Sequence, residues 1–128
     1  KGIYILLIEI DKNIKIEIGS LGKINFDKRI YSYIGSAQNN LEKRAQRHKV
    51  KNKKLRWHID YLLKNKSVKI LKILYKNTGR KEECKIAKRL SKTEIPISKF
   101  GCSDCDCKSH LFKIKNLKNI LNLAMEEL

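Results

Sequence analysis

The chain has 128 residues, 41% of them apolar, so it can bury one hydrophobic core and is too apolar for a disordered chain. No stretch approaches the ~20 apolar residues of a membrane-spanning helix, and Glu9 interrupts the apolar run at residues 3–10 that could otherwise resemble a signal peptide. We therefore expect one cytoplasmic domain over residues 1–128, with no membrane partner. The sequence begins with Lys1 instead of Met, as expected of a trimmed chain or a piece of a longer polypeptide.

The charge of the chain predicts a polyanionic partner. Thirty Lys and Arg against 13 Asp and Glu give a net charge of +17, which opposes compaction unless a polyanion offsets it. Nucleic acid does so, because binding to phosphates releases counterions. The alternative is a bias toward Lys, Ile and Asn, as in AT-rich genomes and thermophiles, with lysine only solvating the surface. Because ion-pair-rich surfaces carry both signs, this bias does not explain the shortage of Asp and Glu.

In the first half of the chain, β-rich runs are followed by a helix. Asp11-Lys12-Asn13 suits a hairpin turn between the first two strands. A helix is predicted from Asn39, a good N-cap with Glu42 at the capping-box position, to about Lys49. The predicted strands cover residues 3–10, 14–18 and 30–34.

The second half continues the alternation of helices and strands. A lysine-rich turn at residues 51–54 precedes the second helix, and an irregular cysteine loop at residues 100–110 precedes the last strand. The predicted helices cover residues 55–64, 81–90 and, as an amphipathic C-terminal helix, 117–128; the predicted strands cover 68–75 and 110–114. The predicted fold class is therefore α/β (α+β), with a small mixed or antiparallel central sheet flanked by helices.

The first helix places two chemically active side chains on its apolar face. Leu41, Ala45 and His48 share that face by their spacing, and Arg44 lies one turn before His48. The structural alternatives are an ion pair that ties Arg44 to the sheet and a hydrogen-bonded, half-buried ring for His48, and the helix alone favours these. A separate basic ridge, either solvated or binding nucleic acid, consists of Lys43, Arg47 and Lys51.

Glu83 heads the apolar stripe of a later helix. It precedes Ile86, Ala87 and Leu90 at helical spacing, and a carboxylate there must be paired, neutralised or bound to a metal. The alternative, interaction with the helix dipole, is served equally well by Glu82. Phosphodiester hydrolysis needs such a carboxylate for a divalent ion, an arginine for the phosphate charge, and a tyrosine or histidine for the attacking water.

Two near-mirrored tripeptides, Gly2-Ile3-Tyr4 and Tyr33-Ile34-Gly35, precede these helices. With the passage from Tyr33 to Arg44, they resemble the GIY-YIG nuclease superfamily, in which a helix carries Arg and then His, and a distant helix carries Glu. The resemblance covers about residues 1–90 and implies a GIY-YIG nuclease-like fold and a metal-dependent endonuclease that hydrolyses DNA phosphodiester bonds. The matching positions are Tyr4, Tyr33, Gly35, Arg44, His48 and Glu83.

The resemblance also implies a role for each matching residue. Glu83 holds a single magnesium or manganese ion, and Arg44 stabilises the transition state. Tyr4 is the general base or positions the water, while Tyr33 and His48 contact phosphate and water. The partner is then nucleic acid, with DNA favoured over RNA. The alternative function is a non-catalytic DNA- or RNA-binding module on the same fold, although a pure binder has no need of a carboxylate near phosphates.

The spacing of the tripeptides departs from the usual pattern of the superfamily. Tyr4 and Tyr33 are separated by 28 residues, many more than usual, so we expect an inserted hairpin at about residues 11–28. A branch of the superfamily looks similar in this respect, and also at residues 55–62 and 100–111. Some of its members are fused to endonuclease III, which implies DNA repair and a fused or associated repair enzyme.

The segment at residues 55–62 has two physical interpretations. In the first, His58 is a satisfied core histidine and Trp57 stacks with Tyr61, one turn away. In the second, His58 or Asp60 supports the active site, and Trp57 stacks on a displaced base as in proteins that bind single strands.

The cysteine loop carries a C-x2-C-x-C-x2-H set that could bind zinc. One nine-residue segment is cramped for a tetrahedral site, and related sequences often have a smaller residue in place of the first cysteine. We therefore expect reduced thiols, with Asp104 and His110 bordering the nuclease cleft and Cys84 facing away from it. A zinc- or redox-responsive adaptor is a further alternative. The set consists of Cys102, Cys105, Cys107 and His110.

Overall fold

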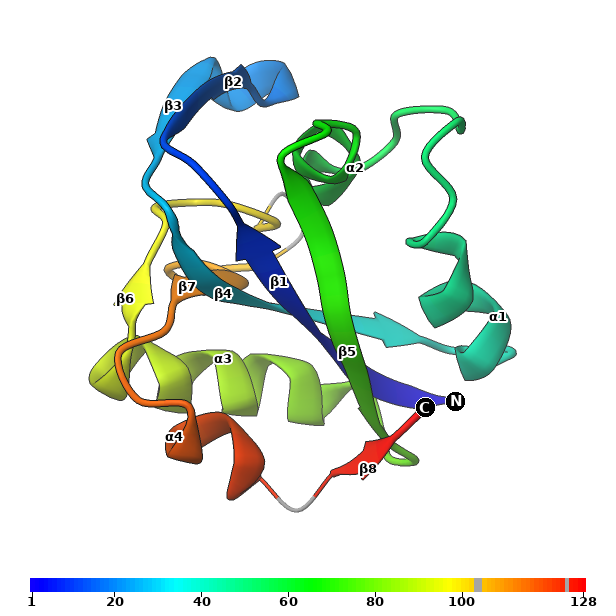
Figure 1. The fold of residues 1–128 in the computed structure, drawn as a ribbon. Helices are drawn as coiled ribbons and strands as arrows, with labels where there is room; N and C mark the ends of the chain where they lie inside the picture. Colours follow the sequence, from blue (N-terminus) through cyan, green and yellow to red (C-terminus); the bar gives the residue numbers. More distant parts are fainter. Residues whose placement is uncertain (103–104, 124) are drawn as a thin grey trace.

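The structure, a computed structural model, describes residues 1–102, 105–123 and 125–128 and contains one six-stranded antiparallel sheet (Figure 1). The strand order is β6-β7-β4-β1-β5-β8. The three central strands, nine residues each, carry most of the pairing. The predicted α+β class, with an antiparallel sheet and flanking helices, is confirmed. The strands are β1 (Gly2–Ile10), β4 (Arg29–Ala37), β5 (Val68–Lys76), β6 (Ile95–Pro96), β7 (Leu111–Lys113) and β8 (Glu126–Glu127).

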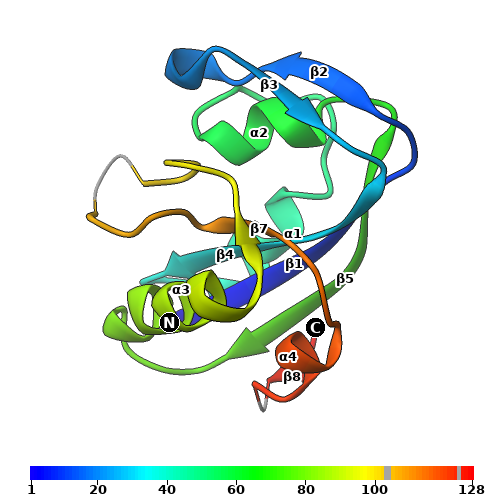
Figure 2. The ribbon, with the colours of Figure 1, turned by 90° about the vertical axis from the view of Figure 1, so that its left-hand side faces the viewer.

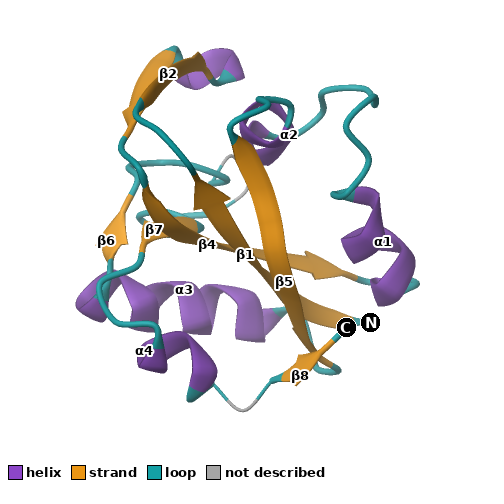
Figure 3. Cartoon of the chain, in the orientation of Figure 1, coloured by secondary structure: helices purple, strands orange, loops and turns teal. Residues whose placement is uncertain are grey.

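Helices cover both faces of this sheet (Figures 1 and 3). Because side chains alternate along a strand, Tyr4 and Leu6 of β1 pack into one buried cluster and Ile3 and Ile5 into another. The first cluster includes side chains of α1 (Leu41–Arg47) and α2 (His58–Leu63). The second includes those of α3 (Lys81–Thr93) and α4 (Lys118–Leu121). β1 is therefore buried on both faces.

The expected insertion between the tripeptides is a separate hairpin, as Figure 2 shows. β2 (Ile14–Glu17) pairs with β3 (Lys23–Phe26) around a short 3-10 turn at Gly19–Leu21. The predicted hairpin turn at residues 11–13 between the first two strands is wrong, because β1 does not pair with β2. Both hydrogen-bonding edges of β1 are occupied over most of its length by β4 and β5, so no edge is left for β2.

The first two helices begin later in the chain than predicted, because side-chain hydrogen bonds determine where each one starts. Asn40, not Asn39, is the N-cap of α1, and its Oδ1 accepts the N–H of Lys43 at 3.1 Å. α2 begins at His58 rather than Leu55. The reason is Asp60, whose Oδ2 accepts the N–H groups of Arg56 and Trp57 and so holds that segment in a non-helical turn.

The predicted C-terminal helix at residues 117–128 is wrong. α4 has four residues, after which the chain returns to the sheet and β8 pairs with β5; residue 124 lies outside the described residues. The N–H of Leu128 donates to the carbonyl of Ile73 at 2.9 Å, and the hydroxyl of Tyr75 donates to Glu126 at 2.8 Å. Pairing with the free edge of β5 is thus favoured over the helix that the weak amphipathic spacing of these residues predicts. Of the described part of the chain, no helix has the length and apolarity needed to cross a membrane.

Candidate active site

The two tripeptides lie side by side on β1 and β4. Tyr4 is directly opposite Gly35, and Leu6 is opposite Tyr33, so both tyrosines project from the same face of the sheet. A Cβ atom on residue 35 would come within 2.5 Å of the Tyr4 ring. Glycine is therefore required there, because the Tyr4 ring lies across the backbone of β4.

A cleft of about 680 Å³ opens at the end of β4. β7 pairs with β4 only as far as Tyr33, so the last residues of β4 form a sheet edge that both helical layers can reach. Tyr4 and Tyr33 face the α1 layer, whereas Ser36 contacts Glu83 of α3. The cleft therefore collects side chains from both layers. Its lining is Tyr4, Tyr33, Gly35, Ser36, Arg44, Trp57, Arg80, Lys81, Glu83, Cys84, Gly101, Cys105 and His110.

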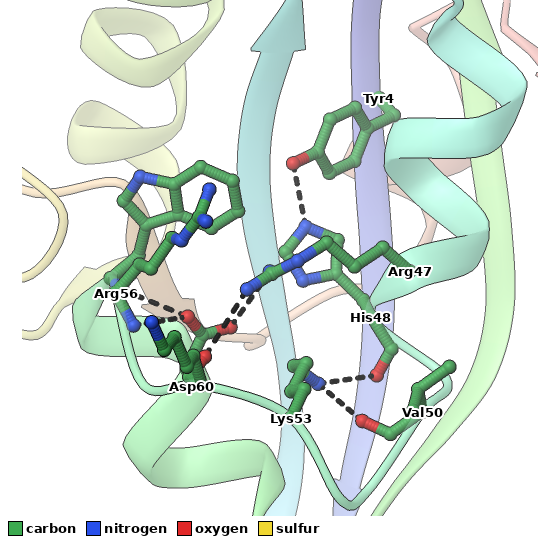
Figure 4. Close-up of polar contacts among 9 residues, drawn as sticks. Tyr4, Arg47, His48, Val50, Lys53, Arg56 and Asp60 are labelled. Carbon is green, nitrogen blue, oxygen red and sulfur yellow. Dashed lines mark hydrogen bonds and ion pairs between the residues drawn. The ribbon is translucent and has the colours of Figure 1, made fainter.

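Tyr4 is hydrogen-bonded to His48, which lies behind it at the end of α1 (Figure 4). The Tyr4 hydroxyl and His48 Nε2 are 2.6 Å apart, and both side chains are buried. Burial raises the pKa of Tyr4 above its ordinary value and lowers the pKa of His48 to about 4. At neutral pH the pair is therefore a neutral phenol hydrogen-bonded to a neutral imidazole, and both pKa shifts oppose transfer of the phenol proton to the ring in the resting site.

Arg44 reaches the cleft over the face of Trp57. Its guanidinium carbon lies 4.4 Å from the centre of the indole ring, and its buried Nε has no hydrogen-bond partner within the described ranges. Arg47 also lies over Trp57, at 4.6 Å, and is held by Asp60 Oδ1 at 3.3 Å (Figure 4). Asp60 is fully buried. Burial opposes its ionisation, but the hydrogen bonds from Trp57, Arg56 and Arg47 together hold its pKa below the ordinary value.

Glu83 enters the cleft from the first turn of α3. Its Oε1 accepts the hydroxyl of Ser36 at 2.8 Å, and its Oε2 lies 3.1 Å from His110 Nδ1. The side chain is 16% exposed. Burial acts to raise the pKa of Glu83, but the hydrogen bonds from His110 and Ser36 outweigh it and lower that pKa. In His110 burial is likewise outweighed by the bond to Glu83, and the pKa is raised.

Four residues that the sequence proposed for nucleic-acid binding or, for His58, for support of the active site lie outside the cleft lining: Lys43, Arg47, Lys51 and His58. Lys51 is committed to the fold, since its ammonium donates to the carbonyls of Leu63 and Val68 at 2.7 Å. The side chain of Lys43 is solvent-exposed. His58 Nδ1 accepts the N–H of Gly101 at 2.9 Å and so anchors the cysteine loop, in agreement with a satisfied histidine.

The cysteine loop folds back onto the start of α3. The thiols of Cys84, Cys105 and Cys107 and one ring nitrogen of His110 all lie within 4.8 Å of one another and could hold a metal ion. The expectation that Cys84 faces away from the cleft is wrong, because the loop before β7 covers the first turn of α3. Cys102 is outside this group, and its thiol lies 3.5 Å from the carbonyl of Phe100.

His110 borders the cleft, as expected, whereas Asp104 lies outside the described residues. Sequence reasoning missed Ser36, Arg80 and Lys81 in the lining, and the position of Cys84 beside the thiols of the loop. Only Ser36 carried a usable signal: it follows Gly35 on a strand, so alternation puts it on the opposite face, toward the layer that contains Glu83.

Comparison with known proteins gives one result. Searches of curated proteins and of solved structures return no match. The family model described as "Domain of unknown function DUF123" matches residues 3–128, nearly the whole chain. The chain therefore belongs to the DUF123 family.

Proposed function

We propose that this protein is a metal-dependent endonuclease that hydrolyses DNA phosphodiester bonds. The observation that carries the proposal is the convergence of Tyr4, Arg44 and Glu83, from three different elements, on one cleft. These groups answer the three needs of the reaction: a route for the proton of water, a cation for the phosphate, and a carboxylate for a metal ion. The resemblance of the same positions to the GIY-YIG nucleases supports it, as does the net charge of +17.

Glu83 is suited to a hard divalent cation. Its carboxylate reaches the cleft, and although each oxygen already accepts one hydrogen bond, each keeps a second lone pair. Oxygen ligands suit Mg²⁺ or Mn²⁺, whereas thiols suit softer metals such as zinc. Magnesium commonly takes only one or two protein carboxylates and otherwise keeps water. Bound at Glu83, the ion would supply charge neutralisation on the phosphate and the leaving oxygen.

Tyr4 and His48 provide the route for the proton of the attacking water. The Tyr4 phenol orients the water at the cleft wall and accepts its proton while giving its own proton to His48 Nε2. The lowered pKa of His48 keeps the imidazole neutral, with a lone pair for the proton, but makes it a weak base, so the protonated ring is only a transient species. A buried tyrosinate, which its raised pKa disfavours, is never required as a resting state.

Arg44 is placed to bind the phosphoryl group. Its Nε lacks a partner in the structure described, and its guanidinium lies over the Trp57 ring, so it is positioned before phosphate oxygens bind. Asp60 supports this arrangement by fixing Arg47 and the backbone of Trp57. Involvement in DNA repair, together with a fused or associated repair enzyme, belongs to the same proposal and derives from the resemblance alone.

The test of this proposal is Glu83→Gln with Glu82→Gln as its matched control. Glu82 is the neighbouring carboxylate on α3 but pairs with Lys76 at 3.1 Å and does not line the cleft. With Mg²⁺ or Mn²⁺, Glu83→Gln should lose strand nicking by at least about 100-fold, the scale of removing a transition-state charge contact. It should bind DNA as well as the wild type or better. Nicking by Glu83→Gln at the rate of Glu82→Gln would refute the assignment.

The alternative, a non-catalytic nucleic-acid-binding module, is favoured by one observation: both oxygens of Glu83 already have protein partners. Such a module would bind DNA with a steep dependence on salt. It would not cleave nicked, branched, flapped or damaged substrates with any divalent ion.

A further inference from the structure

We propose that Cys84, Cys105, Cys107 and His110 bind one zinc ion in a tetrahedral site. The four donor atoms are mutually within 4.8 Å. In a tetrahedron with zinc–sulfur bonds of about 2.3 Å and zinc–nitrogen bonds of about 2.0 Å, neighbouring ligand atoms are about 3.5–3.8 Å apart. Cys105 Sγ and His110 Nε2 are already 3.4 Å apart. A contraction of about 1 Å or less therefore brings the group to zinc geometry.

The ligands come from two separate parts of the chain. Cys84 belongs to α3, whereas the other three ligands lie in the loop before β7. A single nine-residue segment is cramped for a tetrahedral site. In the fold the fourth ligand is Cys84 of α3 instead of Cys102 of the loop, so the site is not confined to that segment. The site then joins α3 to the loop, which is the usual role of a structural zinc ion.

The loop is held in place by contacts that do not involve the proposed ligands' thiols. The N–H of Lys99 donates to the carbonyl of Lys108, and the N–H of His110 donates to that of Phe100, both at 2.8 Å. His58 accepts the N–H of Gly101. These bonds fix the two arms of the loop so that its cysteines face α3.

The orientation of His110 is that of a metal-bound histidine. Its Nδ1 is bonded to Glu83 and its Nε2 points toward the thiols. Ligating histidines almost always donate the second ring N–H to a carboxylate or carbonyl, which fixes the tautomer and makes the ligand more basic. The Glu83–His110 contact thus serves both centres, orienting the zinc ligand on one side and the cleft carboxylate on the other.

The chemistry of the donor set selects zinc over magnesium. Three thiols and one imidazole form a soft set, and the thiols bind as thiolates whose charge a divalent cation offsets. Cys107 is buried and the other two thiols are partly buried. Four protein ligands leave no open position, so the ion is structural and takes no part in hydrolysis. Only its effect on Glu83 rests on the proposed function.

The metal content of the full chain tests the site directly. Protein purified without chelators and dialysed should contain about one zinc per chain by elemental analysis. Cobalt substituted for zinc should give thiolate charge-transfer bands and the intense visible bands of a tetrahedral ion. Protein that keeps no zinc after exposure to excess zinc, or gives an octahedral cobalt spectrum, would overturn the proposal.

Cys84→Ser and Cys102→Ser form a matched pair of variants. Both change a cysteine of the same neighbourhood, but only Cys84 belongs to the ligand set. Cys84→Ser should lose the zinc or bind it at least about 10-fold more weakly, while Cys102→Ser should retain it. The opposite pattern, with zinc lost on removal of Cys102 and kept on removal of Cys84, would replace the proposed site with one confined to the loop.

Thiol reactivity provides a measurement that does not depend on whether variants fold. In wild-type protein, zinc should protect three of the four cysteines from a thiol reagent, and a chelator should expose them. A count that the chelator leaves unchanged would contradict the site. Glu83→Gln separates the two proposals, because it should lose nicking yet retain zinc, whereas Cys84→Ser should lose zinc whether or not the wild type cleaves DNA.

Discussion

Tyr4 and Gly35 show how one residue's size determines another's position. Gly35 leaves the space that the Tyr4 ring occupies, and the ring then reaches His48 at 2.6 Å. The sequence could predict the tyrosine and the histidine because their types and spacing are distinctive. It could not predict their hydrogen bond, which depends on how closely α1 approaches the sheet.

The His48 side chain should make stability depend on pH. His48 is neutral in the fold, with its pKa lowered to about 4 from 6.5, so between those values the unfolded chain binds more protons than the folded chain. The fold therefore keeps its full stability with respect to His48 above pH 6.5, and loses part of it as the pH falls toward 4. Between pH 7 and pH 5 the free energy of unfolding of the wild type should fall by about 2 kcal/mol more than that of His48→Gln. Urea unfolding of both proteins at the two pH values measures the difference, and parallel losses would show that His48 ionises as it does in the unfolded chain.

At the scale of elements, the spacing of apolar residues predicts the long strands and helices but not the short ones. The central strands and α3 have enough alternating or helical positions to be recognised from sequence. β6 and β8 have two residues each, too few for a period, and exist because an edge strand offers free hydrogen-bonding groups. The proposed zinc site could not be predicted for a different reason: only the path of the loop in the fold places Cys84 beside Cys105.

The ammonium groups of Lys51 and Lys43 lie in different surroundings. The Lys51 ammonium closes the end of α2 by donating to the carbonyls of Leu63, Asn65 and Val68, whereas Lys43 is exposed. Lys51→Met should lower the free energy of unfolding by about 1 kcal/mol, because these bonds compete with water. Lys43→Met should leave stability unchanged, which denaturant titration of both variants can check. Equal stability of the two variants would mean that the Lys51 contacts contribute nothing to α2.

At the scale of the whole molecule, the sheet edge determines where chemistry can occur. The +17 charge and the residues of the tripeptides predict a nucleic-acid partner and a phosphodiesterase site, but neither predicts that both helical layers meet at the end of β4. There the α1 layer supplies Arg44 and His48, and the α3 layer supplies Glu83. His110, one of the four residues that could hold a metal ion, lies 3.1 Å from Glu83 and so connects that group to the cleft carboxylate.

The most direct measurement is strand cleavage by the zinc-loaded wild-type protein. Nicked, branched, flapped and damaged DNA would be incubated at low salt with Mg²⁺, with Mn²⁺ and with neither ion. We predict cleavage of at least one substrate that requires Mg²⁺ or Mn²⁺, and none without them. Tight, salt-sensitive binding of every substrate with no cleavage under any condition would contradict the account and leave a binding module in its place.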